Sequence, residues 1–101
     1  MEESEPQSAE RRVDLPLPFR PRRSKDGKVR FEVSNPSKVA AMNLKFNLCS
    51  PQTGEIILPA YFSDGYFHLL PGEKRVIEMH SPSTGNVVVE GYNVDSQIII
   101  K

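Results

Sequence analysis

The sequence has one cysteine, no tryptophan, no excess charge of either sign and no long apolar run. With Cys49 alone, no disulfide can form within the chain. Lysine plus arginine equals aspartate plus glutamate at 13 each, so there is no overall field to attract nucleic acid or an anionic membrane. The apolar runs last only a few residues, which is too short to span a bilayer. These absences predict a domain with neither a nucleic-acid partner nor a membrane partner.

Groups that carry catalysis or bind metals are also scarce. The two histidines, His68 and His80, lie on separate expected strands, and neither belongs to a spacing that holds zinc. The six glycines are scattered singly, so there is no glycine-rich phosphate loop. Nothing in the sequence requires two carboxylates to face each other across a cleft, as glycoside hydrolysis needs. We therefore predict no catalytic residue, no metal and no cofactor in this chain.

The N-terminal part of the chain changes character near residue 13. Residues 1–12 are polar and offer little to bury, so burial cannot offset the entropy lost on ordering, and we expect a disordered tail or linker. No apolar segment follows the start, which argues against a signal peptide in this stretch. Leu15, Leu17 and Phe19 alternate among prolines, which favours an extended segment or a first edge strand. A proline-rich ligand for a partner domain is the alternative. We expect residues 13–101 to form one globular domain.

Alternating apolar and polar residues predict strands over most of that domain. Val29, Phe31 and Val33 fall on one face, and Met42 begins a similar alternation that ends beside Cys49, a core or boundary thiol. About seven short strands separated by turns are typical of a Greek-key sandwich. We therefore predict an all-β, immunoglobulin-like or fibronectin III-like antiparallel β-sandwich. The expected strands are 28–34, 42–48, 56–58, 67–70, 75–80, 86–94 and 97–100.

The segment Tyr61–Glu73 is the densest in structural information. It contains four aromatics, two leucines and two turn dipeptides. Asp64-Gly65 predicts a tight turn with a positive φ at Gly65, and Pro71-Gly72 predicts a second turn. A short strand is therefore expected between two reversals of the chain.

The aromatic residues of this segment admit two interpretations. In the first interpretation most of the aromatic residues fill the core, and Phe62, Phe67 and Leu70 lie in the interior. In the second they contact sugar rings, although tryptophan, the commonest stacking residue, is missing. Alternation leaves Tyr61, Tyr66 and His68 facing outward, so these three are the candidate sugar or interdomain contacts.

Four motifs resemble the C-terminal immunoglobulin-like domain of family 2 glycoside hydrolases, the β-mannosidase type in particular. The motifs are Asn35-Pro36-Ser37, Ala41-Met42-Asn43-Leu44, Leu58-Pro59-Ala60 and the run from Phe62 to Glu73. In that family a Ser-Asp-Asn-Tyr-Phe run followed by Leu-Leu-Pro-Gly-Glu is typical of an accessory sandwich. Gly65 here stands where asparagine is usual, and His68 stands where a small or acidic residue is common.

The resemblance implies a non-catalytic accessory domain that packs against sibling domains and helps to shape access to a catalytic barrel. The catalytic glutamates of the family lie on that barrel, so the resemblance assigns no catalytic residue here. It also implies a periplasmic, secreted or lysosomal parent. The expected partners are the sibling domains and an oligosaccharide, with apolar surface left exposed at 15–19 and near Tyr61. A carbohydrate-binding module and an adhesion or scaffolding domain of the same fold remain alternatives.

Overall fold

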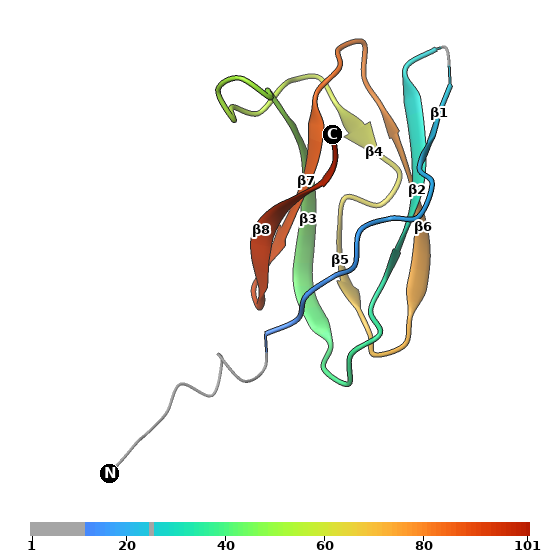
Figure 1. Cartoon of the computed structure of the whole chain (residues 1–101), viewed down its shortest axis with the longest axis vertical. Coiled ribbons are helices and arrows are strands. Elements are labelled where there is room, and N and C mark those ends of the chain that lie inside the picture. The colour runs from blue at the N-terminus through green and yellow to red at the C-terminus, as the bar shows by residue number, and fades with distance from the viewer. Residues whose placement is uncertain (1–11, 25) are drawn as a thin grey trace.

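A computed structural model describes residues 12–24 and 26–101 of the chain (Figure 1). Apart from Arg12, the expected tail lies outside the described residues. No helix in the described part is long and apolar enough to cross a membrane. The described residues form eight strands: β1 (Arg22–Arg23), β2 (Lys28–Ser34), β3 (Ala41–Cys49), β4 (Tyr61–Phe62), β5 (Tyr66–Leu69), β6 (Lys74–His80), β7 (Asn86–Gly91) and β8 (Val94–Ile100).

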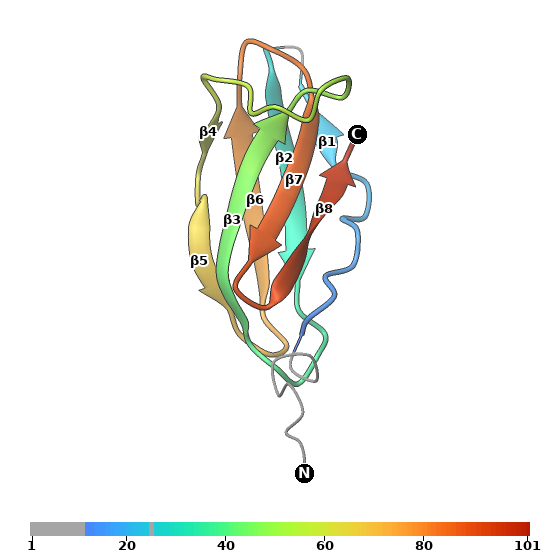
Figure 2. The ribbon, with the colours of Figure 1, turned by 90° about the vertical axis from the view of Figure 1, so that its left-hand side faces the viewer.

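The strands form two antiparallel sheets that pack face to face (Figures 1 and 2). The first sheet has the order β1-β2-β6-β4, and the second has the order β5-β3-β7-β8. Consecutive strands β4 and β5 belong to different sheets and follow each other along one side of the sandwich (Figure 2). The prediction of an all-β immunoglobulin-like sandwich is confirmed.

The core lies between the two sheets and has an aromatic centre. Phe46 of β3 is buried, and its ring centroid lies 5.8 Å from that of Phe31 on β2. The same ring lies 5.9 Å from Phe62 and 5.8 Å from Phe67. Phe62 and Phe67 are partly buried against this core, as expected, but Leu70 is 56% exposed. Phe67 and Leu69 are the inward positions of β5, so alternation puts Leu70 on the outward side.

A β-bulge near the start of β3 corrects one expected orientation. Met42 was expected to point inward, yet it lies on the exposed side. The pairing of β3 with β5 shifts between Ala41 and Leu44, and Asn43 has a positive φ of 54°. A bulge adds one residue to one strand, so the alternation before it is out of phase with the alternation after it. Ala41 and Leu44 are therefore both buried, three positions apart.

One expected strand is absent, and the end of another is wrong. Residues 56–58 form no strand, because only a single bridge joins Ile56 to Cys49 and the following Pro59 has no N–H to continue a ladder. The expected strand 86–94 ends instead at Gly91, and the chain turns at Tyr92-Asn93. The residues expected to form that turn, 95–96, lie inside β8.

Glycine geometry differs between the two turns of the Tyr61–Glu73 segment. Gly72 has a positive φ of 77°, which only glycine adopts without strain. Gly65 is not among the residues with positive φ, so that expectation is wrong. The turn after Asp64 therefore does not need the left-handed conformation.

The segment before β1 crosses the open side of the sandwich from β8 to β2 (Figure 2). The N–H of Val13 donates to the carbonyl of Asn93 at 2.9 Å, and the side-chain amide of Gln97 donates to the carbonyl of Leu15 at 2.9 Å. Val13 and Leu15 are buried, but Leu17 and Phe19 are exposed. The segment is extended, one of the two expected forms, and does not form an edge strand, and Leu17 and Phe19 leave apolar surface uncovered.

Candidate sugar-contact and interdomain site

The three candidate contact residues lie on two different strands. Tyr61 is on β4, the edge of the first sheet, whereas Tyr66 and His68 are on β5, the edge of the second. Tyr61 and Tyr66 are each 66% exposed. Tyr66 and His68 line one surface hollow of about 500 Å³, which Tyr61 does not line. The structure therefore brings together two of the three candidates.

The lining of the hollow includes an arginine, Arg75, that the sequence did not single out. The Arg75 guanidinium lies 4.3 Å from the ring centroid of Phe67 and donates to Asp64 and Glu73, each at 2.8 Å. These hydrogen bonds, first that to Glu73 and then that to Asp64, raise the pKa of Arg75. The lining of the hollow thus includes a hydrogen-bonded charged group stacked on an aromatic ring.

His68 also has a structural contact. Its Nδ1 accepts a hydrogen bond from the N–H of Asn43 at 3.0 Å. Asn43 is the bulge residue of β3, whose N–H is out of register with the β5 ladder. A ring that accepts at Nδ1 carries its proton at Nε2, which leaves that N–H as a donor. His68 therefore supports the bulge with one nitrogen, and its role in sugar or domain contact stays a prediction.

The Glu73 carboxylate makes the edge of the hollow sensitive to pH. The N–H of Leu70 donates to Glu73 at 2.8 Å, and this bond together with Arg75 lowers the pKa of Glu73 below its ordinary value of 4.5. A lowered folded-state pKa contributes stability above the unfolded pKa, and that stability is lost as pH falls through the folded pKa. The contribution is therefore present at neutral pH and absent in strong acid.

We expect Glu73→Gln to be less stable than the wild type at pH 7, with the difference shrinking as pH falls from the unfolded-state pKa through the lower folded-state pKa. Urea denaturation followed by circular dichroism from pH 7 to pH 3 measures this difference. Glu55→Gln, at an exposed turn position, is the matched control. A stability difference that is the same at pH 7 and pH 3 would contradict the assignment to the carboxylate charge.

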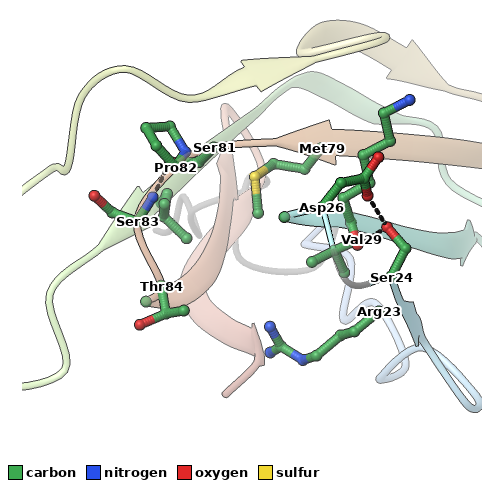
Figure 3. A pocket seen from close by; sticks show the side chains of 13 residues that line it. Arg23, Ser24, Asp26, Val29, Met79, Ser81, Pro82, Ser83 and Thr84 are labelled. Carbon is green, nitrogen blue, oxygen red and sulfur yellow. Dashed lines mark hydrogen bonds between the residues drawn. The ribbon is translucent and has the colours of Figure 1, made fainter.

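A second hollow of about 470 Å³ lies at one end of the sandwich, between the turn before β2 and the turn after β6 (Figure 3). The polar groups that line it stabilise the turns themselves. Ser81 donates to the carbonyl of Pro59 at 2.7 Å and accepts from the N–H of Ser83 at 3.2 Å. The hydroxyl of Ser24 donates to Asp26 and lowers the pKa of that carboxyl. None of the candidate contact residues reaches this hollow.

The groups that could bind a metal or act as a nucleophile are dispersed. Among residues 12–24 and 26–101, no three histidine, cysteine or acidic side chains come together as a metal would require. Cys49 is half-buried, and burial, followed by the nearby charge of Glu90, raises the pKa of its thiol. A raised pKa leaves the thiol protonated at neutral pH, so it lacks the thiolate that a nucleophile needs.

Comparison with known proteins places this sandwich among the domains of sugar-cleaving enzymes. The sequence model of the family described as the exo-β-D-glucosaminidase Ig-fold domain matches residues 9–94. An exo-β-D-glucosaminidase from Arthroderma benhamiae is 30% identical over 74 residues, which are 71% of this chain. The chain covers only 8% of the length of that relative. No solved structure matches.

These matches refine the resemblance given by the sequence motifs. They name exo-β-D-glucosaminidase rather than the β-mannosidase type, while agreeing on an immunoglobulin-like domain of a glycoside hydrolase. The family match extends from residue 9 to residue 94 and so includes strands β1 to β7, ending where β8 begins. This chain therefore belongs to the family of Ig-fold domains of exo-β-D-glucosaminidases.

Proposed function

We propose that this chain is a non-catalytic accessory domain of a longer glycoside hydrolase, in which it packs against the catalytic part and helps to shape access to the substrate. The observation that carries the proposal is the extent of the family match, residues 9–94, set beside the small share of the fungal relative that the chain covers. The family match covers strands β1 to β7, and the fungal relative is similar over one short part of its own length. These two facts support an accessory role, with the catalytic groups expected in the remaining length of the enzyme.

We further propose that the parent acts on β-linked glucosamine. The support is the activity for which the relative and the family are named. The experiment begins with the coding sequence that surrounds this chain and with expression of the whole enzyme. We expect the enzyme to hydrolyse 4-nitrophenyl β-D-glucosaminide at least about tenfold faster, in kcat/KM, than the corresponding β-D-mannoside. Faster cleavage of the mannoside would assign the parent to the β-mannosidase type instead. A coding sequence without a catalytic part would overturn the accessory role.

Direct sugar binding by this domain is the second candidate function. The observation that favours it is the shared hollow of Tyr66 and His68, where an exposed tyrosine lies next to a free imidazole N–H. Titrating the chain with glucosamine disaccharide while following amide shifts distinguishes the two functions. Saturable shifts centred on Tyr66 and His68 would support binding. Their absence would leave Tyr61, Tyr66 and His68 as candidate contacts to a sibling domain.

A further inference from the structure

One outer face of the first sheet carries an exposed aromatic surrounded by arginines. Phe19, 83% exposed, and Val76, 48% exposed, line a surface hollow of about 390 Å³ together with Arg20, Arg22 and Arg30. Phe31 and Glu32 complete the lining. We call the group formed by Phe19, Val76 and these three arginines the arginine patch. It combines an apolar centre with a basic rim.

Two features of the arginine patch lower the stability of the folded domain locally. Arg22 on β1 lies directly opposite Arg30 on β2, and like charges directly opposite each other destabilise an antiparallel pair. Arg20 has a positive φ of 54°, a conformation that glycine or asparagine adopts at lower cost. Its guanidinium lies 5.1 Å from the ring centroid of the exposed Phe19. Local conflicts of this kind are expected where a surface has a function.

Positive charge is concentrated here although the whole chain is neutral. A neighbouring hollow shares Arg22 and Arg30 and adds Arg23, Lys28, Asp26 and Glu78. The two hollows together are lined by five cationic side chains and three carboxylates, a net charge of +2. The whole chain, by contrast, has 13 charges of each sign and no net charge. Within the part of the chain that the structure describes, the ion pairs involve Arg12 and Arg75, and none includes Arg20, Arg22 or Arg30. Arg30 lies directly opposite Glu78 on β6, so Arg20 and Arg22 are the arginines of the patch that are available to a partner.

We propose that the arginine patch is the docking surface through which this domain binds another domain of the same enzyme, whose facing surface is rich in carboxylates around an apolar site. This inference rests on the accessory function proposed above. Guanidinium groups bind carboxylates through two parallel hydrogen bonds, and arginines around a buried aromatic are typical of protein interfaces. A protein surface fits better than a soluble polyanion, because Phe19 and Val76 need an apolar counterpart.

The variant Arg22→Glu tests the proposal because it should stabilise the chain by itself and weaken docking in the intact enzyme. In the chain by itself, the substitution places a carboxylate opposite Arg30 in place of a like charge, and we expect Tm to rise by about 2–4 °C. In the intact enzyme the same change should weaken docking. We expect hydrogen exchange at the amides of Leu17, Phe19 and Arg20, slowed in the intact wild-type enzyme, to become about tenfold faster. If Arg22 had a purely structural role, a rise in Tm would be accompanied by slower exchange at these amides, and a fall in Tm by faster exchange.

Lys38→Glu, in the exposed loop between β2 and β3, is the control of equal charge change and should leave both measurements near their wild-type values. If the intact enzyme protects another face of the domain but not 17–20, the arginine patch is the wrong surface and the accessory function stands. If no face gains protection in the intact enzyme, both proposals fail. Protection of 17–20 in the intact enzyme that appears only after polygalacturonate is added would mean that the patch binds a soluble polyanion, and would also overturn docking.

Discussion

Replacing Phe46 with alanine is expected to lower the free energy of unfolding by about 3–5 kcal/mol, the range for removing a buried aromatic ring. Phe46 is 4% exposed and contacts three other rings, Phe31 and Phe62 from the first sheet and Phe67 from its own. Its removal therefore opens a cavity at the point where the two sheets meet. Because a domain of this size has a total stability of about 5–15 kcal/mol, the loss is a large share of it.

Urea denaturation followed by far-UV circular dichroism measures this effect, since the chain has no tryptophan to report by fluorescence. Phe46→Leu should cost less, about 1–2 kcal/mol, because most of the volume is retained. Tyr66→Ala, at an exposed aromatic on β5, is the surface control and should change stability by no more than about 0.5 kcal/mol. Equal losses for Phe46→Ala and Tyr66→Ala would show that Phe46 does not hold the core together.

Alternation in the sequence predicted the inner faces of the long strands because those strands have one buried side. Val29, Phe31 and Val33 are all buried, as are Ile77 and Met79. A shift of register by one residue would move every one of these side chains to solvent, so the pattern and the pairing determine each other. The same argument placed Tyr66 and His68 on a common outward face.

The errors arose where pairing between distant segments decides the local structure. The bulge at Asn43 is stabilised by His68, which is 25 residues away in the sequence. The turn at Tyr92-Asn93 is fixed by Asn93, whose side chain bonds to the backbone at Ala40 and Met42. Arg75 belongs to the candidate site because β5 and the start of β6 lie close together in space. Arg22 lies opposite Arg30 only because of the register of β1, a strand of two residues. Residue patterns within one segment carry no information on such contacts.

A second large effect is expected at Asn35, a polar residue that is fully buried at 0% exposure. Its side-chain amide donates to the carbonyls of Val39 at 2.8 Å and Leu69 at 3.0 Å. Its oxygen accepts from the N–H of Ser37 at 3.1 Å and from the Ser37 hydroxyl at 2.7 Å. This one side chain therefore joins the end of β2, the loop that follows it and the end of β5.

We expect Asn35→Ala to lower the free energy of unfolding by about 2–4 kcal/mol, because it removes the side-chain donor to the buried Leu69 carbonyl, the donor to the Val39 carbonyl and the acceptor of the Ser37 N–H. Asn35→Asp separates the two halves of the network: it keeps the acceptors, loses both donors and adds a buried charge, so it should be at least as damaging as alanine. Asn47→Ala, on the outward side of β3, should cost about 0.5 kcal/mol or less. If Asn35→Asp were as stable as the wild type, the donors to Val39 and Leu69 would not matter. The link between the two sheets at this end of the sandwich would then have to come from apolar packing alone.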